Sequence, residues 1–456
     1  MEATIEKTNS KQIYIALSVV LVLTLLTQLV DNAFTMITPV LINNFHISTN
    51  VASWVSSLGG IGLAIGFLSF SSFSDFFSEK KLIIVGLALF ILPSILGLLF
   101  QQFYYVVLVA RFIQAIGGIS TSAMYLVLIA RYLPVEQKII WMGFATTSFK
   151  LSTVVGTLAG GFLTEKFGWQ VIFYIPMIAV LAVPLLLKNL PNNPKKNGKI
   201  ELLGFVLLSL VAICINFLAS KPNMLLLGVT VLAVLLFLVY VAKSKNPVVT
   251  MDMLKNKRYM FTLLAALFYY LAQVAIVFLL PFLLQGLFGL NIASVSLSYV
   301  IPYVASAAVA AISGNIIKKL GQVKTLLIGG SLIIVGFFLM AVFAQYGLVM
   351  VQIFLTLIVC GYSLSFSPFL NQSISSLEEK QVGTGIGIFN FVVRISCAVG
   401  ISISAFIINS KAGNMQLFSF VPQSMSRFTV VFLVLLILTF IGTVLYLLLN
   451  KKTEAK

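Results

Sequence analysis

The residue with the clearest chemical role is Asp31, which lies in the middle of an apolar segment that covers residues 13–41. Of the chain's 12 acidic residues, it is the only one with neutral and largely apolar neighbours over ten positions on both sides. A carboxylate at bilayer depth costs about 3 kcal/mol or more to insert, so it normally faces a bundle interior and marks an ion or substrate path. Asp31 is therefore our first candidate for binding a proton. The alternative is a carboxylate that only holds its helix to a neighbour through a hydrogen bond.

Three basic residues also fall at bilayer depth, namely Arg111, Lys150 and Arg394. At a rise of about 1.5 Å per residue, Arg111 lies about 10 Å and Asp31 about 15 Å below the outer ends of their segments, so the two can meet. A proton on Asp31 would then release Arg111 to Gln114 or to backbone carbonyls, giving the bundle two discrete arrangements. The alternative is that Arg111 extends outward to the membrane surface.

The other two basic residues have no acidic neighbour in sequence. Lys150 is either neutral, paired with Asp31 or facing an anionic group of a substrate. Arg394 lies at a similar depth and cannot lose its charge. Three basic groups against one acid predict a cationic interior, which should tolerate carboxylate-bearing or zwitterionic substrates better than an interior with several buried acids. A purely structural role is the alternative for both residues.

The elements that must position these residues are membrane-spanning helices. The chain has 456 residues, of which 60% are hydrophobic and 9% charged, with a mean hydropathy of +1.09. Windows of about 20 apolar residues suffice to cross the bilayer as helices. Fourteen such windows occur, at residues 13–41, 51–73, 82–100, 104–130, 139–163, 169–187, 202–218, 224–242, 259–284, 293–317, 325–343, 348–370, 383–408 and 428–449. The first window has no small-residue cleavage site after it, so we expect an uncleaved first span.

The basic residues predict how the chain is oriented. With the N-terminus in the cytoplasm, 22 of the 29 lysines and arginines fall in inner segments and only four in outer ones. The positive-inside rule therefore places both termini in the cytoplasm. The longest polar inner loops bracket spans seven and eight. We therefore predict an N-terminal six-helix bundle (1–190), a linker with two extra spans (191–250) and a C-terminal six-helix bundle (251–456), with a central site between the bundles.

The inner loop after the second span carries the first recognisable motif. Residues 71–86 read SSFSDFFSEKKLIIVG and include Asp75, Lys80 and Lys81. They resemble the G-x-x-x-D-x-x-G-x-R/K-R/K signature of the major facilitator superfamily, with serine in place of both glycines. The resemblance implies a cytoplasmic latch in which Asp75 meets a helix N-terminus, a basic side chain such as Arg131, or both. Such a latch would favour the outward-open state. The alternative is ordinary inner lysines beside a helix-capping aspartate.

Two further motifs lie in the fourth and fifth spans. In ARFIQAIGG, Arg111 and Gln114 resemble the R-x-x-Q-G-x-G arrangement of proton-coupled members, with alanine in place of one glycine. In FKLSTVVGTLAGGFL, Gly156, Gly160 and Gly161 resemble the G-x-x-x-G-P-x-x-G-G signature of drug exporters, with threonine in place of the proline. Close helix packing through small residues explains these glycines equally well.

The second half supplies aromatic and weakly polar residues toward the midplane. Those that we predict to line a substrate path are Gln273, Tyr269, Tyr270, Tyr303 and Phe366. Aromatic faces bind flat, amphipathic or cationic molecules. The alternative is ordinary helix packing or contact with lipid.

Taken as a whole, the chain resembles the 14-span drug:proton antiporter branch of the major facilitator superfamily. The resemblance implies an all-α integral membrane protein of the major facilitator fold, with two six-helix bundles plus two extra transmembrane helices. It also implies export of amphipathic antibiotics, dyes or biocides in exchange for protons across a bacterial cytoplasmic membrane.

Several absences are also predicted. There is no phosphate-binding G-x-x-x-x-G-K-[ST] loop, so we expect no ATP hydrolysis, no enzymatic activity and no cofactor. The three cysteines lack metal-ligand spacing, and the +17 charge is scattered, so we expect neither a metal site nor a nucleic-acid partner. We expect a monomer in the lipid bilayer whose partners are protons and small-molecule drugs. Two alternatives are a proton-coupled carrier for a siderophore, peptide or lipid, and a non-transporting membrane sensor.

Overall fold

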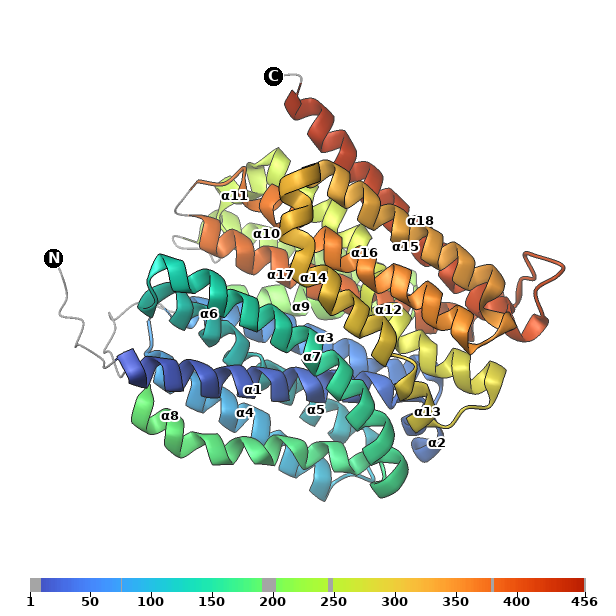
Figure 1. Cartoon of the computed structure of the whole chain (residues 1–456), viewed down its shortest axis with the longest axis horizontal. Coiled ribbons are helices and arrows are strands. Elements are labelled where there is room, and N and C mark those ends of the chain that lie inside the picture. Colours follow the sequence, from blue (N-terminus) through green and yellow to red (C-terminus); the bar gives the residue numbers. More distant parts are fainter. Residues whose placement is uncertain (1–9, 75, 191–201, 245–248, 379–380, 455–456) are drawn as a thin grey trace.

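The computed structural model describes residues 10–74, 76–190, 202–244, 249–378 and 381–454 (Figure 1). Every element in these ranges is a helix. The first-half helices are α1 (Ser10–Met36), α2 (Thr38–Phe45), α3 (Thr49–Phe73), α4 (Glu79–Leu99), α5 (Tyr104–Gly118), α6 (Ser120–Tyr132), α7 (Val135–Phe167), the 3₁₀ helices η1 (Trp169–Phe173) and η2 (Ile175–Ala182), and α8 (Val183–Asn189).

The remaining helices follow after residue 201. They are α9 (Leu202–Ser220), α10 (Met224–Lys243), α11 (Met251–Lys255), α12 (Lys257–Phe288), α13 (Ile292–Leu297), α14 (Val300–Leu320), α15 (Gln322–Phe343), η3 (Ala344–Tyr346), α16 (Leu348–Ile374), α17 (Val382–Asn409), η5 (Lys411–Asn414) and α18 (Gln423–Glu454). Side chains cap several helix starts: Ser48 accepts a hydrogen bond from Val51 N at α3, and Asn256 accepts one from Tyr259 N at α12.

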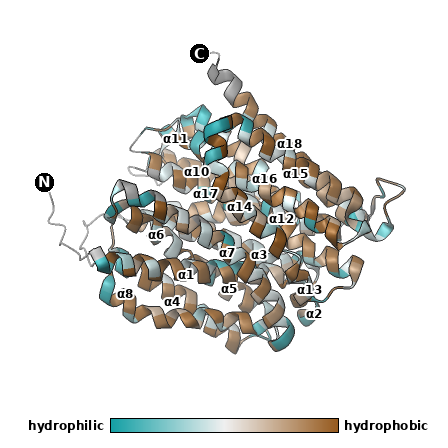
Figure 2. Cartoon of the chain, viewed as in Figure 1, coloured by the Kyte–Doolittle hydropathy of each residue, from teal (hydrophilic) through white to brown (hydrophobic). Residues whose placement is uncertain are grey.

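The predicted membrane-spanning architecture is confirmed. Within the ranges given above, 13 helical segments are long and apolar enough to cross a membrane. The remaining predicted span falls on α7, which has 33 residues and packs along α1. Apolar residues dominate the helix bodies, and hydrophilic residues gather toward their ends (Figure 2). A helix is required at these depths because the bilayer offers the backbone no hydrogen-bond partners.

The buried apolar side chains form two large cores. The first is built from residues 13–190, and the second is built almost entirely from residues 249–446. In Figure 1 the first-half helices (blue to green) lie together in the lower part of the view and the second-half helices (yellow to red) in the upper part. The exact boundaries near residues 190 and 250 stay a prediction.

Helices α3 and α7 form the boundary with the second half. Helix α3 packs along α17, and α7 packs against α13 and α14. The extra pair, α9 and α10, pack on one another, and α9 also contacts α3 and α17. A small third cluster of apolar residues joins α3, α9 and α17, including Ile61, Phe205 and Ile395. The charged residues at mid-span therefore lie on helices that meet at or near this boundary.

Candidate functional site

The central feature of the site is an ion pair inside the first half. Arg111 on α5 donates a hydrogen bond from Nη2 to Asp31 Oδ1 on α1. The two partners differ in access: the Arg111 side chain is 2% exposed and the Asp31 side chain 22% exposed. The carboxylate is therefore partly accessible, whereas the guanidinium is enclosed.

Several neighbours hold the Arg111 guanidinium in place. Its Nη1 donates to Gln114 Oε1 at 3.2 Å, and Gln114 Nε2 donates to Ser94 Oγ on α4 at 2.8 Å. The guanidinium carbon lies 4.9 Å from the centre of the Phe34 ring. A Cβ atom at Gly59 on α3 would lie 2.8 Å from Arg111 Nη2, so a larger residue there would displace the guanidinium. Apart from Asp31, the guanidinium thus contacts Gln114 of its own helix and the Phe34 ring of α1, and Gly59 of α3 leaves room for it.

The predicted glycine motif positions α1 and therefore Asp31. A Cβ atom at Gly156 would lie 2.5 Å from Leu29 O, and one at Gly160 would lie 2.9 Å from Ala33 Cα. Both glycines face α1, one on each side of the height of Asp31. The next residue, Gly161, faces the other half, where a Cβ atom would lie 2.5 Å from Ser296 Cβ on α13. Small residues at this spacing allow α7 to approach both neighbours closely.

Arg394 on α17 brings a second cation toward Asp31. Its side chain is partly buried and lies within electrostatic reach of Asp31 and Cys397. Among the described residues, no carboxylate, hydroxyl or carbonyl accepts a hydrogen bond from its guanidinium. The sequence predicted a mid-span position for Arg394, and the electrostatic interaction with Asp31 was not part of that prediction.

Lys150 on α7 lies in a separate place. Its Nζ donates to Ser306 Oγ on α14 at 3.2 Å and to Ser363 Oγ on α16 at 3.0 Å. The two serine hydroxyls also bond to each other at 2.7 Å. Of the three possibilities that the sequence left open for Lys150, pairing with Asp31 is not seen here. The residue instead links the first half to the second.

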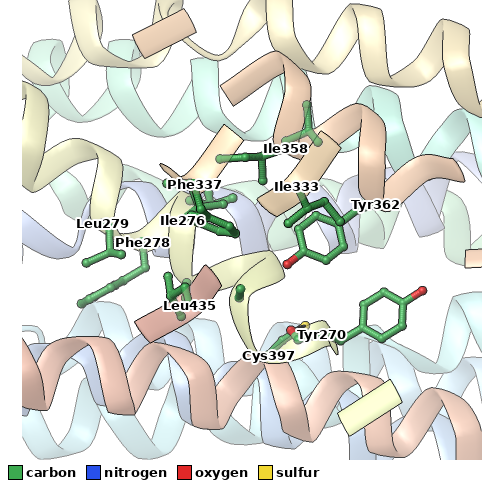
Figure 3. Close-up of a cluster of buried hydrophobic side chains, with 14 of the residues drawn as sticks. Tyr270, Ile276, Phe278, Leu279, Ile333, Phe337, Ile358, Tyr362, Cys397 and Leu435 are labelled. Carbon is green, nitrogen blue, oxygen red and sulfur yellow. Dashed lines mark hydrogen bonds between the residues drawn. The ribbon is translucent and has the colours of Figure 1, made fainter. Parts of the chain in front are cut away.

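The predicted aromatic residues are mostly core residues. Tyr269 and Tyr270 are fully buried, Tyr303 is 8% exposed, and all three belong to the second core. Figure 3 shows Tyr270 and Tyr362 among the buried apolar side chains, with Cys397 beside Tyr270. In this structure these tyrosines present no open surface to a substrate. The surroundings of these tyrosines match ordinary helix packing better than the wall of a substrate cavity.

Two other residues of that prediction are more accessible. Phe366 is 39% exposed, and its ring centre lies 6.0 Å from that of Phe389. Gln273 is partly buried, and its Oε1 accepts a weak hydrogen bond from Cys397 Sγ at 3.7 Å. Gln273 on α12 therefore contacts Cys397 on α17, and Phe366 on α16 contacts Phe389 on α17.

The predicted inner latch is partly visible. Asp75 lies outside the described residues, so its contacts stay a prediction. Arg131 on α6 donates to Ser74 O at 2.9 Å and to the fully buried Glu79 on α4 at 2.6 Å. Glu79 did not appear among the candidate residues, although its place directly after the capping Ser78 was a usable signal.

The two lysines of the latch have other contacts. Lys80 donates to Leu187 O at 2.5 Å, and Lys81 Nζ lies 5.1 Å from the centre of the Phe77 ring. Both contacts remain within the first half. These contacts tie the ends of α3, α4, α6 and α8 together within the first half.

A second residue that sequence reasoning missed lies at the outer end of α7. Glu165 accepts hydrogen bonds from Asn291 Nδ2 at 2.8 Å and from Ala293 N at 3.0 Å. It therefore caps the start of α13, which belongs to the other half. Its position at a span end made it look like an ordinary polar surface residue.

Two of the surface hollows on the described residues are formed without Asp31 and Arg111. One of about 460 Å³ lies near Gln101 and Tyr174, and one of about 490 Å³ lies near Lys11 and Trp141. Over the part of the chain that the structure covers, no group of three or more histidine, cysteine or acidic residues is arranged to hold a metal ion.

Comparison with known proteins now adds to this geometry. Residues 20–401 match the family model of the Major Facilitator Superfamily. Multidrug resistance protein Stp of Mycobacterium tuberculosis (strain CDC 1551 / Oshkosh) is 23% identical over 377 residues, which cover 79% of this chain and 69% of that protein. Riboflavin transporter RibZ of Clostridioides difficile (strain 630) is 23% identical over 455 residues, which cover 97% of this chain and 99% of that protein.

A solved structure agrees in fold. The crystal structure of a D-xylose-proton symporter superposes with a TM-score of 0.69 at 12% identity and covers 97% of both chains. The helices, the family match and these relatives describe a multi-pass protein of the plasma membrane that transports small molecules and is not an enzyme. This chain belongs to the Major Facilitator Superfamily of membrane transporters.

Proposed function

We propose that this chain is a proton-coupled antiporter that exports amphipathic antibiotics, dyes or biocides from the cell. The observation that carries the proposal is the Asp31–Arg111 pair, in which the acid is partly exposed and the base is enclosed. A proton-binding group must be accessible to water, and its counter-ion must be retained when the proton arrives. The relative that confers multidrug resistance supports the substrate class.

The pair can have two states because Arg111 has partners other than Asp31. A proton from outside neutralises Asp31 and weakens its bond to Arg111. Removing one partner of a buried ion pair normally costs about 3 to 5 kcal/mol. Here Gln114 and the Phe34 ring already contact the guanidinium and offset part of that cost. The resulting change in the packing of α1 and α5 would accompany drug release and the rocking of the halves.

The return step uses the same residues in the opposite order. When the site faces the cytoplasm, Asp31 loses its proton and pairs with Arg111 again while a drug enters. Energy would come from the proton gradient, so the cycle requires no cofactor. A single chain holds both halves and the pair, so a monomer suffices.

The test is proton-driven uptake of ethidium into inverted membrane vesicles. We expect Asp31→Asn to lower the rate by about a hundredfold, as for loss of a coupling of about 3 kcal/mol. Asp252→Asn removes an exposed carboxylate on α11 and serves as the matched control. A near-normal rate of ethidium uptake with the Asp31 variant, at equal amounts of protein in the membrane, would contradict the proposal.

A second candidate function is a proton-coupled carrier for a natural metabolite. It is favoured by the match to a riboflavin transporter along almost the whole of both chains. A transport panel in the same vesicles, comparing riboflavin and other metabolites with ethidium, separates the two functions. Membership of a transporter family argues against the third alternative, a membrane sensor that moves nothing.

A further inference from the structure

A buried asparagine on the extra helix α9 contacts both halves of the molecule. Asn216 Nδ2 donates a hydrogen bond to Ser57 Oγ on α3 at 3.3 Å, and Asn216 Oδ1 accepts one from Ser402 Oγ on α17 at 3.0 Å. All three side chains are fully buried. Lipid offers an amide no hydrogen-bond partner, so a buried amide must find its partners on neighbouring helices. We call Ser57, Asn216 and Ser402 the α9 clamp.

Helix α9 is attached more firmly to α3 than to α17, although it contacts both and lies between them in the view of Figure 1. At the outer ends, Asn50 Nδ2 donates to Ser220 O at 3.0 Å, and Ser220 Oγ donates to Asn50 Oδ1 at 2.9 Å. One turn further in, the ring centres of Trp54 and Phe217 lie 4.1 Å apart. Toward α17, the described residues supply one hydrogen bond, from Ser402, and the apolar third cluster. We therefore expect α9 to move with α3.

The height of the α9 clamp determines which motion it opposes. At a rise of about 1.5 Å per residue, Ser57 lies about 12 Å from the start of α3 and Ser402 about 10 Å from the end of α17. Both of these helix ends face outward in the predicted orientation. Separation of the outer ends of α3 and α17 must therefore pull Ser402 away from Asn216.

We propose that the α9 clamp holds the outer ends of the two halves together, so that the extra pair of helices sets the equilibrium between outward-closed and outward-open arrangements. In the closed arrangement both polar groups of Asn216 have a partner in the α9 clamp. On opening, water can reach the separated groups from outside and replace the lost hydrogen bond. One buried hydrogen bond of this kind shifts an equilibrium by about tenfold, which biases the motion without blocking it.

The effect of the α9 clamp goes beyond the proposed function. The clamp acts on the halves themselves, so it operates for any transported molecule and for any proton-binding residue. It also gives the extra pair a role that neither six-helix bundle can fill, because only α9 lies against both α3 and α17 at this edge and carries the bridging amide.

The test measures the separation of the outer ends in the purified full-length protein. Spin labels are placed at the exposed outer positions Asn44 on α2 and Asn409 on α17 in a cysteine-free chain. We expect Ser402→Ala to raise the ratio of the longer to the shorter distance by about tenfold, because it removes the one hydrogen bond to the second half. Asn216→Leu should have a similar effect. In an Asn216→Leu chain, Ser402→Ala should add little, because its partner is already absent.

The matched control is Ser209→Ala on the same helix. The hydroxyl of Ser209 donates to Phe205 O of α9 itself at 2.6 Å, so its loss should leave the distance ratio unchanged. Equal unfolding temperatures of Ser402→Ala and Ser209→Ala would show that the shift does not come from general destabilisation. An unchanged ratio in Ser402→Ala would overturn the proposal, as would an equal shift in Ser209→Ala. Ser402→Ala is the smaller change and decides the question if Asn216→Leu does not fold.

This outcome is separate from that of the proposed function, because the labels report the separation of the outer ends and not transport. If Asp31→Asn retains ethidium uptake while Ser402→Ala shifts the distances, only the proposed function is wrong. If Asp31→Asn abolishes uptake while both clamp variants leave the distances unchanged, only the α9 clamp is wrong.

Discussion

Lys150 on α7 donates a hydrogen bond to Ser363 on α16, and this contact crosses the boundary between the two halves of the molecule. The same ammonium group also bonds to Ser306 on α14, so one side chain of the first half engages two helices of the second. Any rocking of the halves that separates α7 from α14 and α16 must break both bonds. This contact gives the first prediction.

Lys150→Met should favour the alternative arrangement of the halves. Hydrogen bonds from a charged donor contribute about 1.5 to 3 kcal/mol each, so their loss should shift the equilibrium by about tenfold or more. The shift can be measured as distances between spin labels at the exposed outer positions Phe167 and Met415 in a cysteine-free chain. Lys150→Arg, which keeps the donor, is the matched control. An unchanged distance distribution in Lys150→Met would show that the bonds do not hold the halves.

Glu165→Ala should loosen the outer contact between α7 and α13. The change removes acceptors for Asn291 Nδ2 and Ala293 N, but the carboxylate is exposed, so the effect should be about 1 kcal/mol. A cysteine at the buried position Ser296 should then react about fivefold faster with a membrane-impermeant thiol reagent. Lys166→Ala, at the next residue, should leave the reaction rate unchanged. An equal rise in both variants would point to general destabilisation instead.

Gly156→Ala should destabilise the first half. The added Cβ would lie 2.5 Å from Leu29 O, so α1 and α7 would have to separate, at a cost of about 1 to 3 kcal/mol. The unfolding temperature of the purified protein should fall, and proton-coupled transport should fall with it because Asp31 is on α1. The matched control is Gly143→Ala on the same helix, where an added Cβ meets no atom within 4 Å. Equal unfolding temperatures for the two variants would exclude the tight contact.

Glu79→Gln should weaken the inner end of the first half. It removes the charge that accepts the 2.6 Å hydrogen bond from Arg131, whose side chain is 31% exposed and partly screened by water. We expect a loss of about 1 to 2 kcal/mol, less than for a fully enclosed pair. Chemical or thermal unfolding measures this loss, and Glu165→Gln provides a carboxylate-to-amide change at the opposite end of a span. If the two variants had similar stabilities, the contact between Glu79 and Arg131 would contribute no more to stability than the contacts of Glu165.

The contact between Asp31 and Arg111 was predictable from the sequence, whereas the partners of Lys150 were not. The helical rise fixes how far Asp31 and Arg111 lie below the outer ends of their spans, and that sufficed to anticipate their pairing. The rotation of a helix about its axis is fixed only by tertiary packing. For this reason the partners of Lys150 and the burial of Tyr269 and Tyr270 were not visible in the sequence.

The two missed carboxylates have a different explanation. Glu79 and Glu165 sit at the first and last turns of their helices, where polar residues normally face water. Each one instead contacts another segment: Glu79 contacts Arg131 of α6, and Glu165 contacts the first turn of α13. Only the assembled ends of the helices distinguish such residues from solvated ones.

The consecutive glycines 160 and 161 face different halves of the molecule, α1 on one side and α13 on the other. At these two positions α7 presents no side chain to either neighbour. When one half turns against the other, no side chain at these two positions has to change its rotamer or withdraw from the neighbouring helix. The barrier to the motion should therefore be low at this level, and the rate of the transport cycle should be limited elsewhere.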